Sequence, residues 1–275
     1  AEMNPSYKEG SRMIGNSVNL KTELCKTVNA FVSMHKQNHH VTTNWKESIV
    51  GFADVNHPYI RNLRNLISST HYMPEDFLPD CTVILSCFLP FANEIGDSNI
   101  AGDVPSAIWV NAYNETNQMF TELGEHIRHV IAQWGYAAVV PAPVGTIDAD
   151  HIYSNWSQRH IAYAAGIGTF GVNNMLITDS GTCGRFFSLI TNLPVAPDTP
   201  LKEERCLYKR NGACGFCIKQ CPIHAIRSEK PFDRRSCFER LANFKRYLGA
   251  NACGKCVVGL PCTFHNPSMP ARKPR

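Results

Sequence analysis

Twelve cysteines are the residues of this 275-residue chain best suited to chemistry, and eight of them crowd together near its C-terminal end. The stretch "ACGFCIKQCPIHAI" contains Cys214, Cys217 and Cys221, and a proline directly follows the third cysteine. Bacterial ferredoxins ligate [4Fe–4S] clusters through a C-x2-C-x2-C-x3-C-P run, so only the first cysteine of that run is missing here. The pattern therefore predicts an iron–sulfur module, with the residues after Pro222 continuing into a helix.

The missing ligand has one good candidate. Asn211 stands where the run expects its first cysteine, and Cys206 is the nearest cysteine upstream, across an inserted basic loop "LYKRNGA". Eight thiolates can hold two clusters, and soft sulfur suits iron. In ferredoxins the fourth cysteine of a run ligates the other cluster. One predicted cluster therefore takes Cys206, Cys214, Cys217 and Cys262, and the other takes Cys221, Cys237, Cys253 and Cys256.

Zinc is the alternative that the spacing leaves open. Cys214 with Cys217, and Cys253 with Cys256, form two C-x2-C pairs of the kind that hold structural zinc. Zinc would leave the other four cysteines of this region without a role, including the one in the Cys-Pro pair, so we favour two iron–sulfur clusters. Three cysteines elsewhere lie in apolar segments and are expected as small core side chains: Cys25, Cys81 and Cys87.

The bulk composition is that of an ordinary globular protein. Hydrophobic residues make up 44% of the chain, and 27 basic against 23 acidic residues leave a net charge of +4, too mild to indicate nucleic-acid binding by itself. We find no apolar run long enough to cross a bilayer and no signal-peptide core at the N-terminus. We therefore expect a cytoplasmic protein, where clustered thiols hold metal more often than they form disulfides.

The apolar pattern predicts alternating helices and strands, an α+β or α/β fold. A proline-rich, charged stretch, "PVAPDTPLKEER", has the composition of a linker. It divides the chain into a cofactor-binding body, residues 1–195, and a small ferredoxin-like domain, residues 196–275. The expected helices are 17–37, 106–134 and one ending at Gly166, and the expected strands are 81–89, the start of "YAAVVPAPVG", 174–178 and 185–193.

The stretch "GIGTFG" has the G-x-G-x-x-G spacing of a dinucleotide-binding loop. That fingerprint needs a strand before it and a helix after it, whereas here a helix precedes and a strand follows. We therefore do not assign nucleotide binding to this loop. The glycines indicate instead that the backbone turns sharply or approaches something bulky.

Three segments taken in order resemble the epoxyqueuosine reductase family, which is related to corrinoid reductive dehalogenases. They are "RHIAYAAGIGTFGVNNMLI", then "GRFFSLITNLPV", then the eight-cysteine unit. The resemblance implies a nitroreductase-like body that holds cobalamin and receives electrons from two [4Fe–4S] clusters. By position it implies corrin contacts for Arg159, Gly166, Gly168, Gly171, Asn173 and Asn174. A tight helix-to-strand turn without any ligand is the alternative role of the glycines.

The family uses an acidic residue upstream of this loop as proton donor. Counting back from Arg159 reaches Ile152, which carries no acid, so we predict a donor among the neighbouring Asp148, Asp150 and Tyr153. The implied partners are an external low-potential electron donor and a small-molecule or modified-nucleoside substrate, with tRNA as a further partner. Two alternatives stay open: a different reductase on the same scaffold, and an electron-transfer protein without cobalamin.

Overall fold

The computed structural model describes residues 5–142, 152–228 and 231–269. At its centre is a four-stranded sheet in the order β1-β2-β6-β3, in which every neighbouring pair is antiparallel. The antiparallel pairing favours the α+β member of the two predicted classes, because an α/β fold is built on a parallel sheet. The strands are β1 (Ile49–Asp54), β2 (Val83–Pro90), β6 (Gly184–Thr191) and β3 (Ala138–Val139).

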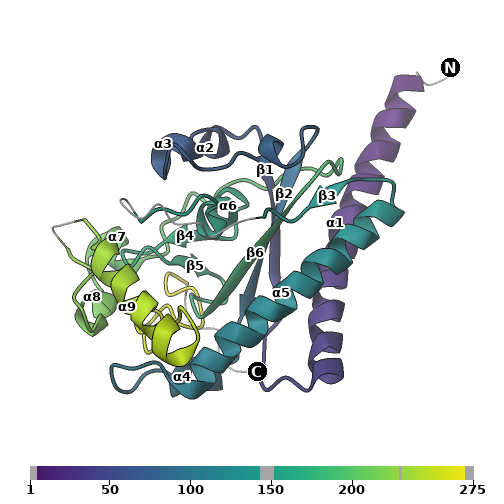
Figure 1. Ribbon diagram of the computed structural model, residues 1–275. Helices are drawn as coiled ribbons and strands as arrows, with labels where there is room; N and C mark the ends of the chain where they lie inside the picture. Colours follow the sequence, from purple (N-terminus) through teal and green to yellow (C-terminus); the bar gives the residue numbers. More distant parts are fainter. Residues whose placement is uncertain (1–4, 143–151, 229–230, 270–275) are drawn as a thin grey trace.

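Each face of the sheet is covered by helices (Figure 1). Because successive side chains of a strand point to opposite faces, β2 feeds two cores. Leu85 and Leu89 pack toward α1 (Pro5–His39) and α5 (Ala107–Gln133). Ile84 and Phe88 pack toward the other face, against α2 (Pro58–Arg61), α3 (Leu63–Leu66) and α6 (Gln158–Ala164).

Most of the predicted elements are present. The helix predicted at 106–134 is α5, whose first turn is capped by the Ser106 hydroxyl accepting from the Trp109 amide, and the strand predicted at 81–89 is β2. The helix predicted at 17–37 is the C-terminal part of the longer α1. The strand predicted from "YAAVVPAPVG" is reduced to the two residues of β3.

A small second sheet follows α6 and pairs β4 (Gly168–Phe170) with β5 (Leu176–Thr178). A helix precedes the glycine-rich stretch and a strand follows it, as predicted. This order confirms that the loop lacks the strand-before, helix-after context of a dinucleotide fingerprint. The carbonyl of Ile177 stands 2.4 Å from where a Cβ of residue 168 would lie. Glycine is required there because no side chain fits between the two strands.

The cysteine-rich segment packs against one end of the sheet, beside α4 (Asn93–Ser98) and the start of α5 (Figure 1). Its own helices are α7 (Leu207–Asn211), α8 (Phe216–Gln220) and α9 (Arg234–Leu248). Ala252 and Val258 share a core with Phe91, Ile95 and Trp109 of the body. The helix predicted after Pro222 is wrong, since residues 222–228 form a turn and extended chain, and His224 there has a φ of 50°.

The predicted linker is tied to the body at both ends. The Asp198 carboxylate accepts from the Phe52 amide at 2.8 Å and pairs with Lys21 at 2.8 Å. The buried Arg205 guanidinium pairs with Asp179 at 2.8 Å and donates to the carbonyl of Ile167. The domain boundary near residue 196 stays a prediction.

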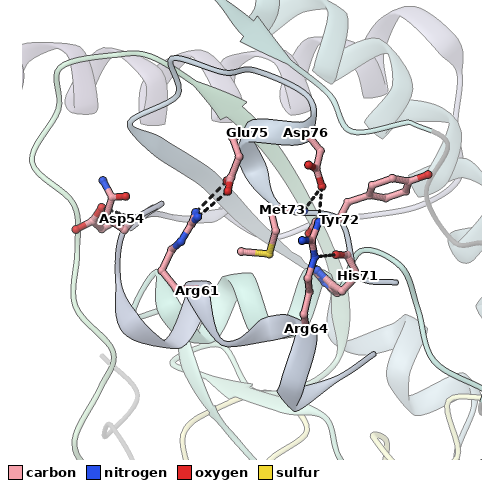
Figure 2. A network of polar contacts seen from close by, with 9 residues as sticks. Asp54, Arg61, Arg64, His71, Tyr72, Met73, Glu75 and Asp76 are labelled. Atoms are coloured by element: carbon pink, nitrogen blue, oxygen red, sulfur yellow. Dashed lines mark hydrogen bonds and ion pairs between the residues drawn. The ribbon is translucent and has the colours of Figure 1, made fainter. Parts of the chain in front are cut away.

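A network of polar contacts fixes the connection between α2, α3 and the 3-10 turn η1 (Pro74–Asp76) (Figure 2). The Arg61 guanidinium forms a two-pronged ion pair with Glu75 at 2.6 and 2.9 Å. Arg64 contacts Asp76 at 3.1 Å and donates to the carbonyl of His71 at 3.0 Å. The network ties α2 and α3 to the segment of residues 71–76. Among the described residues, no helix is long and apolar enough to cross a membrane.

Candidate functional site

The structure gathers four of the eight cysteines, here named the first quartet, around one cavity. Cys206 precedes α7, Cys214 and Cys217 lie at the start of α8, and Cys262 comes from the C-terminal loop. All four line a single cavity whose wall is almost entirely apolar. Burial first, and then the negative charge of the other three as thiolates, raises the pKa of Cys217 to about 12. These are the four cysteines predicted to share one cluster.

The other four cysteines, the second quartet, also lie within electrostatic reach of one another. They are Cys221 at the end of α8, Cys237 in α9, and Cys253 and Cys256 in the loop after α9. Burial raises the pKa of Cys237 to about 11, and the thiolates of Cys253 and Cys221 add to the rise. Burial likewise raises the pKa of Cys256, and there the nearby thiolates include Cys217 of the first quartet. The two quartets are therefore neighbours.

Buried polar contacts fix the loop that carries Cys253 and Cys256. Between them, the Lys255 side chain is 2% exposed and donates to the carbonyls of Asn99 and Ala101, each at 2.8 Å. Gln220 of α8 donates to the carbonyl of Lys255 at 2.8 Å. The loop is thereby attached both to the body and to the helix between the quartets.

The chemistry of the two quartets can be compared with zinc and with iron–sulfur clusters. Tetrahedral zinc with bonds of about 2.3 Å holds its sulfur ligands roughly 3.8 Å apart. Among the described residues, which include all eight cysteines, no three cysteine sulfurs lie within 4.8 Å of one another. An iron–sulfur cube separates its ligands more widely, because each thiolate binds a different iron atom. The eight thiols are free and either buried or half-buried, and their wider spacing is compatible with [4Fe–4S] cubes. The choice of clusters over zinc stays a prediction.

A pocket of about 220 Å³ opens beside the second quartet. Cys237 forms part of its wall, together with Arg159 and His160 of α6 and with Ile152 and Tyr153. Helix α3 and helix α9 close it from either side through Leu66, Ile67, Phe238 and Leu241. A molecule bound in this pocket would contact both the body and the second quartet.

Arg159 is the central charged residue of this pocket. Its guanidinium donates to the carbonyl of Asn174 at 2.5 Å and contacts the sulfur of Met175 at 3.4 Å. Burial lowers the pKa of Arg159, and the thiolates of Cys256 and Cys237 act in the opposite direction. A half-buried cation therefore lines the pocket within electrostatic reach of the second quartet.

The six residues predicted to contact a corrin have different positions. Arg159 alone lines the pocket, whereas Gly171 and Asn173 line the cavity of the first quartet. Gly166 has a φ of 69°, and a Cβ there would lie 2.5 Å from the carbonyl of Thr199. Gly168 packs against β5, and Asn174, with a φ of 58°, turns its carbonyl to Arg159. Gly166 and Gly168 are therefore required for packing within the protein.

The fit of a corrin to this pocket is limited. Ligand pockets usually measure about 300–1,000 Å³, and the cavity enclosed by the described residues is smaller at about 220 Å³. The described residues therefore do not by themselves enclose a corrin ring, and we derive no reaction step through one.

Of the predicted proton donors, Tyr153 lies in the pocket. The Arg234 guanidinium stacks over its ring at 5.0 Å from the centroid. Asp148 and Asp150 lie outside the described residues. Ile152, the position reached by counting back from Arg159, has a φ of 58°, which is rare for a β-branched side chain. The backbone is thus strained at the wall of the pocket.

Two histidines near the pocket were not predicted from the sequence. Burial first, then the Arg159 cation, lowers the pKa of His160 to about 4. The His160 ring contacts the Ser157 hydroxyl at 2.7 Å, and the Ser157 amide donates to His71 at 3.0 Å. The adjacent pair Arg159-His160 was the available signal, since a histidine beside a cation favours its neutral form.

The sequence has curated relatives among epoxyqueuosine reductases. It is 27% identical to that of Vibrio cholerae over 209 residues, which is 68% of this chain and 52% of the relative. The chain thus spans about half the length of that relative. No protein-family model matches it.

Solved structures agree in fold. An epoxyqueuosine reductase bound to an epoxyqueuosine-modified tRNA-Tyr stem loop superposes with a TM-score of 0.57 at 17% identity, over 90% of this chain and 66% of that one. A Bacillus subtilis epoxyqueuosine reductase whose catalytic aspartate loop is swung out of the active site gives 0.54 at 17%, with the same coverage. A catabolic reductive dehalogenase in complex with 3-bromo-4-hydroxybenzoic acid gives 0.52 at 16% identity, over 79% of this chain and 30% of that one. The chain is thus similar in sequence to epoxyqueuosine reductases, and it shares its fold with epoxyqueuosine reductases and reductive dehalogenases.

Proposed function

We propose that this chain is an oxidoreductase of the epoxyqueuosine reductase type that carries two [4Fe–4S] clusters. The proposal rests on the spatial order of the first quartet, the second quartet and the pocket. The first quartet neighbours the second, and Cys237 of the second quartet forms the wall of the pocket that holds Arg159. Electrons from an external low-potential donor would enter at the first cluster, pass to the second and reach an acceptor in the pocket.

Several residues would act on an acceptor bound in this pocket. The half-buried Arg159 cation would attract an anionic group or stabilise negative charge that develops on reduction. Tyr153 would orient a polar group, and its phenol is a candidate proton donor. His160, whose pKa is lowered by burial and by Arg159, would stay neutral at physiological pH and could accept a hydrogen bond.

Cobalamin is the resident cofactor that we propose from the family resemblance. When bound, it would supply a strongly nucleophilic reduced cobalt, chemistry that no side chain provides. Arg159 is the described residue best placed to contact it, because it alone of the predicted contacts lines the pocket. A corrinoid would require more room than the described residues enclose.

The proposed substrate is a modified nucleoside, carried on tRNA or free. One relative in fold is an epoxyqueuosine reductase bound to a modified tRNA stem loop, which supports this class of substrate. A second carries a catalytic aspartate on a loop that can leave the active site. By analogy, we propose Asp148 or Asp150 as the proton donor, next to the pocket residues Ile152 and Tyr153 in sequence.

A second candidate is an electron-transfer protein that binds no cobalamin. The small volume of the pocket, about 220 Å³, is the observation that favours it. On that reading the second cluster would pass electrons through the same surface to a partner enzyme.

Anaerobic purification of the chain, followed by iron, sulfide and corrinoid analysis, tests both candidates. We expect about eight iron and eight sulfide per chain and broad visible absorption. Replacement of Cys206 or Cys237 by Ser should remove about half of the iron, whereas the matched variant Cys81→Ser, outside both quartets, should retain all of it. Zinc without sulfide would contradict the cluster proposal. Clusters without retained cobalamin at micromolar concentration would exclude the corrinoid enzyme and leave the electron carrier.

A further inference from the structure

A group of side chains that could ligate a metal ion lies outside both quartets, between α1 and α5. His35 and His39 are one turn apart on α1, so both project from the same side of that helix. Glu122 comes from α5, which runs beside α1 (Figure 1). Among the described residues, this is the one group of three histidine, cysteine or carboxylate side chains whose ligand atoms all lie within 4.8 Å of one another.

The distances match those of a tetrahedral metal site. Nδ1 of His35 lies 3.3 Å from Oε2 of Glu122, and Nε2 of His39 lies 3.4 Å from the same oxygen. A tetrahedral zinc site with bonds of about 2.0–2.1 Å separates its nitrogen and oxygen ligands by roughly 3.3 Å. The two imidazole rings are stacked, with centroids 4.4 Å apart, which brings both nitrogens to one carboxylate. Two of the three distances between ligand atoms, His35 to Glu122 and His39 to Glu122, therefore already match those of such a zinc site.

The state of His35 indicates a ligand rather than a simple ion pair. The residue is 4% exposed, and its Nδ1 is a buried polar atom without a hydrogen-bond partner, although Glu122 is close. A buried polar atom left unpaired is costly and calls for an explanation. Glu122 is near enough to form an ion pair with this nitrogen, but the contact does not meet hydrogen-bond geometry, and a metal ion between the two would satisfy both groups.

The other charged or aromatic groups nearby are already engaged. The Glu115 carboxylate accepts from the amides of Thr42 and Thr43 at 3.1 and 2.8 Å. The ring of His126 packs on Phe31 with centroids 5.0 Å apart. The protein thus offers three ligands, and the partly exposed side of His39 and Glu122 leaves a fourth position for water.

We propose that His35, His39 and Glu122 bind a divalent metal ion of the zinc type and thereby join α1 to α5. Two imidazoles with one carboxylate suit zinc and its neighbours in the first transition row. The site contains no sulfur and is formed by residues outside both quartets. The inference does not depend on the proposed reductase activity.

Zinc binding to the cluster-loaded full chain tests the proposal, because iron then occupies the cysteines. Equilibrium dialysis against buffered Zn²⁺ should give one additional zinc per chain. X-ray absorption at the zinc edge should show nitrogen and oxygen ligands at about 2.0–2.1 Å, and no sulfur at about 2.3 Å. The variant His39→Ala should bind zinc at least tenfold more weakly, since even partners that only support a ligand contribute about 10–100-fold. Glu122→Gln should also weaken binding.

The matched control is His129→Ala, an exposed histidine on α5 that contacts Gln133, and it should bind zinc as the unaltered chain does. Both histidine variants change an exposed or half-exposed side chain, and circular dichroism without metal should show both to be folded. Zinc should raise the thermal midpoint of the unaltered chain and of His129→Ala, but not of His39→Ala. Sulfur ligands at the zinc edge, or equal zinc affinity in His39→Ala and His129→Ala, would overturn the proposal.

Discussion

The side-chain amide of Asn173 donates a hydrogen bond of 2.6 Å to the backbone carbonyl of Cys256. It joins the glycine-rich segment of the body to the loop that carries part of the second quartet. Asn173 is 2% exposed, and its oxygen also accepts from the Met175 amide at 3.1 Å. A residue predicted as a corrin contact thus connects the two parts of the protein.

Replacement of Asn173 by Ala should destabilise the protein and the second cluster together. The change leaves the partly buried carbonyl of Cys256 and amide of Met175 without these partners, at a cost of about 1–3 kcal/mol. We expect a lower midpoint of urea unfolding for the variant, and faster loss of iron when the purified variant is diluted. The matched variant Asn243→Ala, on the exposed face of α9, should change neither quantity. Equal iron retention in the two variants would show that the bond does not support the cluster.

Two glycine variants separate backbone strain from steric overlap. Gly166 and Gly135 both have positive φ, 69° and 83°, but only residue 166 would place a Cβ against backbone, 2.5 Å from the carbonyl of Thr199. Gly135→Ala should cost about 1–2 kcal/mol through φ alone. Gly166→Ala should cost roughly 2–4 kcal/mol, because the overlap adds to the strain. Chemical denaturation measures both losses in the free energy of unfolding. Equal losses would mean that the segment around Thr199 can move aside without an energetic cost.

Arg159 should tune the potential of the second cluster. Its cation lies within electrostatic reach of Cys256 and Cys237, and a positive charge stabilises the more negative reduced cluster. Arg159→Gln should lower that potential by on the order of 50–100 mV, since a unit charge at about 8 Å contributes about 2 kcal/mol at an effective dielectric constant of 20. Redox titration followed by electron paramagnetic resonance measures the shift.

Two further variants test whether charge is the cause of that shift. Arg159→Lys retains the cation and should keep most of the potential. Arg128→Gln removes a cation from a surface ion pair on α5 and should leave the potential unchanged. A shift in Arg159→Lys as large as in Arg159→Gln would point to altered packing instead.

His160 should make the protein less stable in mild acid. Its pKa is lowered to about 4 in the folded protein, by burial and by the Arg159 cation, whereas the unfolded chain titrates near 6.5. Between these values the unfolded chain binds a proton that the folded protein does not, so stability falls as the pH drops from about 6.5 to 4. Above that window the contribution of His160 is constant.

The variant His160→Gln should therefore lose less stability between pH 7 and pH 5 than the unaltered chain, by on the order of 2 kcal/mol. Urea midpoints at the two pH values measure this difference. His71, whose pKa burial also lowers, retains its own contribution in the variant. The exposed His129→Gln serves as control and should follow the unaltered chain. An unchanged pH dependence in His160→Gln would show that His160 is not held neutral.

The sequence alone was sufficient for the main helices and the buried strand. Helices such as α5 and strands such as β2 follow from local periodicity, which a single segment contains. The two predicted sets of four cysteines are also the two sets that lie within electrostatic reach of one another. Their role as cluster ligands stays a prediction.

The roles of single polar residues depended on contacts between distant segments. Asn173 meets Cys256, and Gly166 meets Thr199, across loops whose approach no local pattern encodes. The short β3 and the turn after Pro222 also differ from the prediction, because the surrounding packing overrode local preference.

Residue types and spacing, which the sequence contains directly, determined the kinds of ligand available: soft thiolates, an arginine and two histidines one turn apart. Only the tertiary structure decided which of them face one another. It placed Arg159 beside the second quartet and Glu122 beside His35 and His39. The physical reason is that charge and coordination act over a few ångströms in space, a distance that separation along the chain does not specify.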